Sequence, residues 1–146
     1  MTLQQLLGTE LPIIQAPMAG VQGSALAIAV SNAGGLGSLP CAMLDSVAIR
    51  HEITAIQAQT SKPFNVNFFC HTQPEPDLKK DASWRKQLTP YYHELNLDPL
   101  MNAAGASRLP FSWQVAEVLV ELRPKVVSFH FGLPEPDLLD YVKRTG

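Results

Sequence analysis

Short apolar runs alternate with longer helical patterns along this chain, and that alternation restricts its fold more than any other feature. The apolar runs cover residues 11–16 (LPIIQA), 36–40 (LGSLP), 64–69 (FNVNFF) and 125–130 (KVVSFH). Helical patterns cover residues 23–33, 45–59, 77–96 (interrupted near Pro90), 112–122 and 136–144. A strand followed by a helix, four times over, is typical of a parallel sheet with helical crossovers. We therefore expect an α/β fold with about four parallel strands, the first of them buried.

Several residues predict where these helices begin, end and pack. Ser24 is suited to cap the helix over 23–33, and the glycines after that helix are suited to end it. Asp45 or Ser46 is expected to open the helix that runs to Gln59. The apolar side chains of that helix recur on or near one face, which predicts its buried side: Val47, Ile49, Ile53 and Ile56.

Composition excludes several classes of protein. The 146 residues are enough for one domain with a core, and 46% of them are hydrophobic. A formal net charge of −2, with no basic run, argues against nucleic acid as a partner. The longest apolar run, near residues 24–30, is too short to span a bilayer, which takes about 20 residues. Two cysteines suggest no disulfide framework, so we expect a reducing, cytoplasmic location.

The first motif follows the apolar run over 11–16 and reads QAPMAG, residues 15–20. Ligands of parallel α/β proteins sit beyond the carboxyl ends of the strands. Small residues around Pro17 and Met18 would let the backbone approach a flat ligand, and the Met thioether is a soft contact for a ring. The alternative is a tight strand-to-helix turn in which Met18 plugs the core.

The second motif holds two asparagines in one strand. Alternation places Asn65 and Asn67 on one face and Val66 and Phe68 on the other. Buried amides must find partners, because an unpaired one costs ~1–3 kcal/mol. We expect Asn67, nearer the end of the strand, to contact a ligand, and Asn65 to have a structural role.

The third motif ends the last strand. Ser128 and His130 share one face of residues 125–130, whereas Phe129 and Phe131 share the other, which suits packing against helices. A lone histidine in a strand is usually a satisfied core residue. His130 stands at the strand end close to Gly132, which favours a place at the mouth of a site.

No metal site is expected from the cysteines and histidines. Cys70 and His71 are adjacent, so on a strand they would point to opposite faces and could not bind one metal ion.

Taken together, four segments closely resemble the nitronate monooxygenase family: QAPMAG (15–20), VSNAGGLGSLP (30–40), PFNVNFFCH (63–71) and RPKVVSFHFGLP (123–134). The resemblance implies a TIM-barrel-like fold with an inserted smaller domain. It also implies non-covalently bound FMN, no metal, and the oxidation of alkyl nitronates, such as propionate-3-nitronate, with O2. The partners would then be a small-molecule nitronate and O2.

Carried over residue by residue, the resemblance implies that Ala16, Pro17 and Met18 lie near the flavin ring. It implies that Asn67 hydrogen-bonds FMN and that His130 lines the pocket. The catalytic histidine of the family lies in a Glu-Ala-Gly-Gly-His type of segment, C-terminal to these motifs, which this sequence does not contain. No catalytic residue is therefore assigned, and His130 is not given that role.

The resemblance also indicates that residues 1–146 are the N-terminal part of an FMN-binding barrel, since a complete barrel takes roughly 250 residues. We expect a partial barrel to bind flavin weakly and to self-associate through its open edges. Two alternatives stay open. One is a non-catalytic half-barrel, and the other is a relative of the FMN-dependent enoyl-acyl-carrier reductases, which share the barrel and similar QAPM-type starts.

Overall fold

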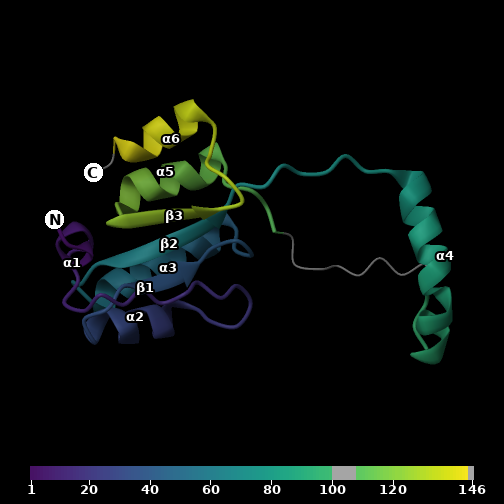
Figure 1. The fold of residues 1–146 in the computed structure, drawn as a ribbon, viewed down its shortest axis with the longest axis horizontal. Helices are drawn as coiled ribbons and strands as arrows, with labels where there is room; N and C mark the ends of the chain where they lie inside the picture. Colours follow the sequence, from purple (N-terminus) through teal and green to yellow (C-terminus); the bar gives the residue numbers. More distant parts are fainter. Residues whose placement is uncertain (100–107, 145–146) are drawn as a thin grey trace. The chain divides into compact units, whose positions relative to one another are not determined.

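The computed structural model describes residues 1–99 and 108–144. Its contacts divide the chain into two compact units. The first unit combines Met1–Thr72 with Ser107–Gly146, and the second is Gln73–Ala106. The first unit holds a sheet and its helices, and the second holds one long helix (Figure 1). None of the described helices is both long and apolar enough to cross a membrane.

Three parallel strands form the sheet: β1 (Gly37–Pro40), β2 (Phe64–Phe69) and β3 (Val126–His130). Their spatial order is β1-β2-β3, so β2 pairs with both of its neighbours. A helix lies in the sequence between each pair of strands, as a parallel sheet requires. The predicted α/β class, with parallel strands and helical crossovers, is confirmed.

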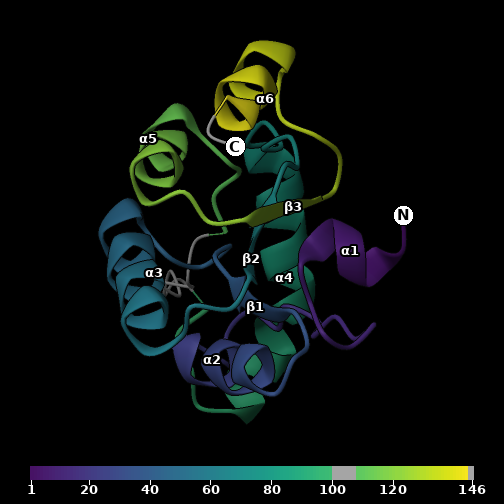
Figure 2. The same ribbon diagram turned by 90° about the vertical axis from the view of Figure 1, so that its left-hand side faces the viewer.

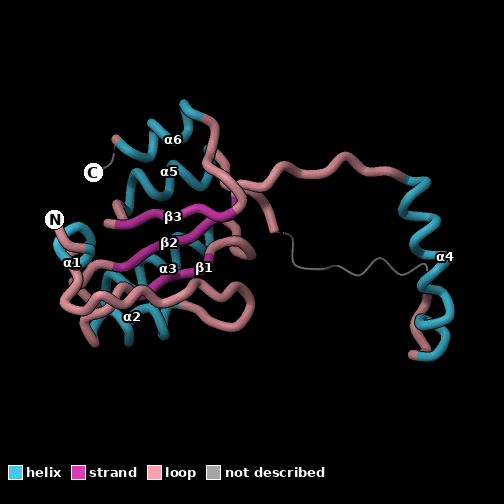
Figure 3. Tube along the Cα trace, viewed as in Figure 1, coloured by secondary structure: helices cyan, strands magenta, loops and turns pink. Residues whose placement is uncertain are grey.

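The first predicted strand is wrong. Residues 11–16 run as loop (Figure 3), and only Ile14 pairs with Leu36, in a single parallel bridge. Leu36 N donates to Ile13 O over 2.9 Å, but Pro12 has no N–H with which to extend the ladder. The segment is also exposed rather than buried, with Ile14 at 51%. The described residues therefore form three strands instead of about four.

Helices cover one face of the sheet. Figure 2 shows α2 (Ser24–Asn32), α3 (Ser46–Gln59) and α5 (Trp113–Leu122) on that side, with α6 (Pro136–Lys143) next to α5. The core joins strand residues Leu39, Val66 and Phe68 to helix residues that are all nearly or fully buried: Ala27, Ile49, Ile53, Ile56, Ala116, Leu119, Leu138 and Val142. Excluding this apolar surface from water is the main favourable term for folding the unit.

Helix α3 matches its prediction closely. Asp45 is its N-cap, and Asp45 Oδ1 accepts a hydrogen bond from Ala48 N over 2.8 Å. Ile49, Ile53 and Ile56 form the buried face. Val47, which was grouped with them, is 75% exposed and lies off that face.

Helix α2 begins differently from its prediction. Gly23, not Ser24, is the N-cap, and no side chain of α2 caps it. The Ser24 N–H instead donates to Glu52 Oε2 on α3 over 2.8 Å. Hydrogen bonding from Ser24, by its side chain first and by its backbone N–H next, lowers the pKa of Glu52 below its usual 4.5. A carboxylate at a helix N-terminus also suits the helix dipole, so Glu52 ties α2 to α3.

Gly37 lets β1 lie directly against α2. A Cβ built on Gly37 would meet Ala27 O at 2.0 Å and Ser31 Oγ at 2.7 Å. Ser31 Oγ accepts from Gly37 N over 3.2 Å and donates to Pro63 O over 3.0 Å. No other residue type fits at Gly37 without separating the helix from the strand.

Two helices depart from the sequence predictions in other ways. The short helix α1 (Leu3–Leu7) was not predicted, although Thr2 and Gln5 form a capping box at its start. In the second unit, α4 (Leu78–Glu94) continues through Pro90, where an interruption was expected. Residues 98–112 hold Pro, Gly, Asn and Ser, which predicts a loop, and this segment lies partly outside the described residues.

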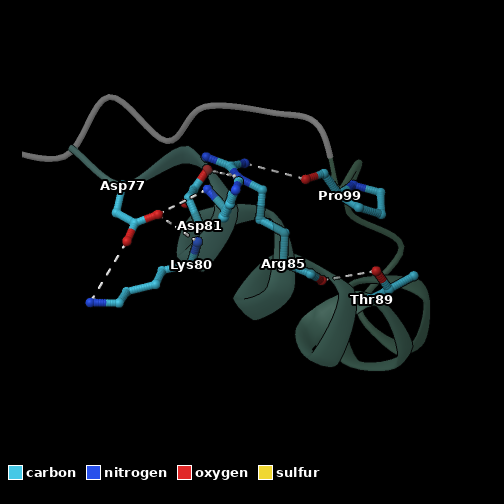
Figure 4. A network of polar contacts seen from close by, with 7 residues as sticks. Asp77, Lys80, Asp81, Arg85, Thr89 and Pro99 are labelled. Carbon is cyan, nitrogen blue, oxygen red and sulfur yellow. Dashed lines mark hydrogen bonds and ion pairs between the residues drawn. The ribbon is translucent and has the colours of Figure 1, made fainter.

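Helix α4 is held by local polar contacts. Asp77 Oδ1 accepts from the backbone N–H of Lys79 and of Lys80, each over 3.0 Å. Arg85 Nε donates to Asp81 over 2.8 Å, and Thr89 Oγ1 donates to Arg85 O over 2.9 Å (Figure 4). Arg85 also reaches Pro99 O at 3.5 Å, which draws the chain after the helix back along it.

Replacing Glu52 by Ala should lower the free energy of unfolding by about 1 kcal/mol, the usual worth of a helix cap. The pKa of Glu52 is lower in the folded chain than in the unfolded one. Its contribution should therefore be complete above pH 4.5 and disappear as the pH falls through the folded-state pKa. Urea unfolding over a pH series measures both effects. Glu117→Ala, an exposed glutamate on α5, is the control. Equal losses in the two variants would contradict the capping role.

The two thiols should react at very different rates. Cys41 is 2% exposed, and burial raises the pKa of its thiol to about 12. Burial also raises the pKa of the half-buried Cys70 thiol. We expect Ellman's reagent, at mildly alkaline pH, to modify Cys70 slowly in the native chain and Cys41 only after denaturation. In Cys70→Ser the native reaction should vanish. Rapid modification of that variant would show that Cys41 is accessible.

Candidate functional site

The face of the sheet opposite the helices is polar. Because side chains alternate along each strand, Ser38 on β1, Asn65 and Asn67 on β2, and Ser128 and His130 on β3 share this face. The parallel register places Ser38 opposite Asn65, and Asn67 opposite Ser128. Polar residues from all three strands therefore lie side by side, as the alternation in β2 and in β3 predicted for those two strands.

Asn67, Ser128 and His130 form one hydrogen-bonded group at the carboxyl ends of β2 and β3. Asn67 Nδ2 donates to Ser128 Oγ over 2.9 Å and lies 3.2 Å from Ser128 O. The Nδ1 atom of His130 lies 3.0 Å from Asn67 Nδ2 and 3.2 Å from Asn67 Oδ1. Asn67 is 2% exposed, whereas His130 is exposed. A buried amide thus contacts an imidazole that solvent or a ligand can reach.

Asn65 lies deeper on the same face and is 4% exposed. Its Nδ2 donates to Ser38 Oγ over 3.1 Å. Its Oδ1 is buried and has no hydrogen-bond partner among the described residues. The structural role expected for Asn65 is consistent with the bond to Ser38, but half of its amide remains unpaired on the polar face.

The loop that contains Ala16, Pro17 and Met18 is fastened to β1 by Gln15. Gln15 Oε1 accepts from Ser38 N over 3.0 Å, and Gln22 Nε2 donates to Ser38 O over 2.7 Å. These bonds hold both ends of the loop against β1.

The turn inside this loop lies close to the segment that follows β1. Val21 N donates to Met18 O, and a Cβ on Gly20 (φ 85°) would lie 3.3 Å from Met43 Sδ. Met18 is 44% exposed, so it does not plug the core. The structure brings Asn67 and His130 into direct contact and leaves Ala16, Pro17 and Met18 in this loop beside β1.

Phe131 was assigned to the wrong face. The sequence pattern placed it with Phe129 against the helices, but Phe131 has φ 66° and is 68% exposed. Its ring contacts Phe69 edge-on, with centroids 4.8 Å apart, and lies near the rings of His71 and His130. The left-handed backbone ends the alternation one residue early and turns this ring to the polar side. The adjacent Gly132 was the available signal, since glycine marks a strand end where the chain leaves the sheet.

A separate cavity of about 290 Å³ lies on the helical side of the sheet, between the starts of α3 and α5. Cys41, Asp45, Phe68 and Phe111 are among its lining residues, and no predicted site residue is among them. Of the predicted residues, Asn67 and His130 lie instead on the polar face, and Ala16, Pro17 and Met18 lie in the loop beside β1. Among the described residues, no three His, Cys, Asp or Glu side chains gather closely enough to hold a metal ion.

Comparison with known proteins gives a consistent result. The family model for nitronate monooxygenase matches residues 1–146. A nitronate monooxygenase of Paraburkholderia phytofirmans is 41% identical over 148 residues, which cover 99% of this chain and 40% of the relative. A nitronate monooxygenase of Pseudomonas aeruginosa is 40% identical over 144 residues, which cover 97% of this chain and 41% of the relative. The chain thus spans about 40% of the length of these curated relatives.

Solved structures agree. A nitroalkane oxidase from Streptomyces ansochromogenes superposes with a TM-score of 0.77 at 34% identity, over 94% of this chain and 39% of that one. The M276A mutant of FabK from Thermotoga maritima superposes with a TM-score of 0.63 at 25% identity, over 98% of this chain and 35% of that one. With a family model that matches the whole chain, and with polar groups at the strand ends where its motifs lie, this chain belongs to the nitronate monooxygenase family, a family of enzymes.

Proposed function

We propose that this chain serves the FMN-dependent oxidation of alkyl nitronates, propionate-3-nitronate among them, with O2 in the cytoplasm. Membership of the nitronate monooxygenase family supports the reaction. The contact between Asn67 and His130 supports the carboxyl ends of β2 and β3 as the site of the reaction. That contact is the observation on which the proposal mainly rests.

The residues of the polar face suit a flavin ring. A flat heterocycle with a polar edge needs hydrogen-bonding groups on one side and apolar, polarizable groups around it. Asn67 and His130 offer the first kind, and the exposed ring of Phe131 beside His130 offers the second. Met18, exposed in the loop beside β1, would add a further contact of the second kind. The unpaired Oδ1 of Asn65 marks further unused hydrogen-bonding capacity on this face. FMN, when bound, would supply the capacity to accept electrons from the substrate.

Each predicted residue would have a distinct part in holding the ring. Ala16 and Pro17 would allow close approach of the loop backbone, and Met18 would contact the ring. Asn67 and His130 would orient the polar edge. Phosphate groups usually bind to backbone amides and helix N-termini, and the resemblance assigns those loops to segments C-terminal to these motifs. The 146-residue chain by itself is therefore proposed to hold FMN weakly.

A second candidate is a non-catalytic half-barrel that associates through its sheet edges. β3 pairs only with β2 among the described residues, so its outer edge offers unpaired backbone groups. This candidate predicts association without nitronate turnover. The enzyme proposal predicts turnover once the remainder of a family member is supplied.

A chimera tests the proposed function. The matched segment of the Pseudomonas aeruginosa relative would be replaced by this chain, and oxygen uptake measured with propionate-3-nitronate. We expect turnover of the nitronate and none of an enoyl thioester supplied with a reduced nicotinamide. His130→Ala in the chimera should lower kcat/KM on the order of tenfold, which is the worth of one hydrogen bond to a ligand.

His51→Ala, at an exposed position on α3, is the matched control and should leave kcat/KM unchanged. Reduction of the enoyl thioester would favour the reductase alternative. A folded chimera that turns over neither substrate would favour the non-catalytic half-barrel.

A further inference from the structure

The Asn67 amide has one orientation that suits its surroundings. Its Nδ2 lies 3.2 Å from Ser128 O and 2.9 Å from Ser128 Oγ. A backbone carbonyl oxygen can only accept, so turning the amide over would set two acceptor oxygens against each other. Ser128 therefore holds the Asn67 nitrogen on its own side.

This orientation leaves two ways for Asn67 to meet Nδ1 of His130. Asn67 Nδ2 could donate to the ring nitrogen, over 3.0 Å, or the ring N–H could donate to Asn67 Oδ1, over 3.2 Å. In the first case Oδ1 would lack a donor among the described residues, inside a side chain that is only 2% exposed. In the second case Oδ1 accepts from the ring, and both amide hydrogens go to the two Ser128 oxygens, because Nδ2 then lies 3.0 Å from a ring nitrogen that is itself a donor. Because unpaired buried polar atoms are costly, the second arrangement is favoured.

We propose that Asn67, oriented by Ser128, holds the neutral imidazole of His130 in the tautomer that carries its proton on Nδ1. Toward the ring, Asn67 and Ser128 act as positioning residues, and the second lone pair of Asn67 Oδ1 is left for the proposed contact with the flavin. The Nε2 atom then carries a lone pair and has no hydrogen-bond partner within residues 1–99 and 108–144. The end of β3 thus presents a hydrogen-bond acceptor on the polar face.

An acceptor at Nε2 selects the kind of group that can bind there. It suits a ligand that donates a hydrogen bond, and the imide N–H of a flavin ring is such a donor. It does not suit an alkyl nitronate, whose two oxygens only accept. This assignment of His130 to the flavin rests on the proposed function, whereas the tautomer itself depends only on residues of this chain.

Long-range proton–nitrogen correlation NMR tests the tautomer directly. In the ¹⁵N-labelled chain at alkaline pH, where imidazole is neutral, Nδ1 of His130 should show the shift of a protonated ring nitrogen and Nε2 that of a bare one. His130→Gln assigns the signals. The exposed His93 provides a reference for a ring that is free to exchange tautomers.

Two substitutions separate positioning from mere structural support. Ser128→Ala keeps the backbone carbonyl oxygen that orients the Asn67 amide and should preserve the wild-type shift pattern. Asn67→Leu should move both nitrogen shifts toward those of His93. A protonated Nε2 in the wild-type chain would overturn the proposal, whether or not the leucine variant folds. Failure of the chimera to oxidise nitronates, with the Nδ1–H signature present, would count against the proposed function alone.

Discussion

The pairing of β2 with both of its neighbours is the constraint on which the rest of this structure depends. It fixes the register that sets Val66 between Leu39 and Val127 on one face, and Asn67 beside Ser128 on the other. The first face is covered by α2, α3 and α5 and forms the core. The second face keeps the polar groups together at the carboxyl ends of the strands. A slip of one residue would exchange the two faces and bury the asparagines under the helices.

Hydrogen bonding then decides what the polar face can do. Asn67 contacts both Ser128 and His130 through its amide, and these contacts fix the amide so that it can orient a ring. Asn65 is only half paired, because its Oδ1 has no partner in the described part of the chain. An unpaired buried oxygen of this kind costs ~1–3 kcal/mol. The polar face thus holds both an unpaired buried oxygen and the exposed imidazole of His130. These two features suit the binding of a ligand better than the packing of further protein.

Local chemistry was sufficient to predict some of the elements. The alternation over 64–69 predicted both faces of β2, and Asp45 predicted the start of α3. Residues 11–16 have an apolar pattern like that of a strand, but a ladder needs N–H donors, and Pro12 interrupts them. Phe131 followed the alternation of β3, but its positive φ reverses the direction of the side chain. The neighbouring Gly132 is only an indirect sign of that torsion, because it marks where the chain leaves the sheet.

The contact between Asn67 and His130 was also beyond sequence reasoning in its details. Both residues could be placed at strand ends, but their contact depends on the register of β2 against β3, which a single strand does not reveal. The same holds for Ser128, whose carbonyl and hydroxyl oxygens orient the amide. The flavin contacts of Ala16, Pro17, Met18, Asn67 and His130 remain predictions that the resemblance supports.

Mapping the binding of riboflavin onto the ¹⁵N- and ¹³C-labelled chain tests the central claim most directly, because NMR detects weak binding and this flavin needs no phosphate site. The account predicts shift changes at the Asn67 side-chain amide, the His130 ring and the Met18 methyl group, with Gln114 and Val115 beside the separate cavity unaffected. Changes confined to that cavity, or none at saturating riboflavin, would contradict the assignment of the polar face as the flavin site.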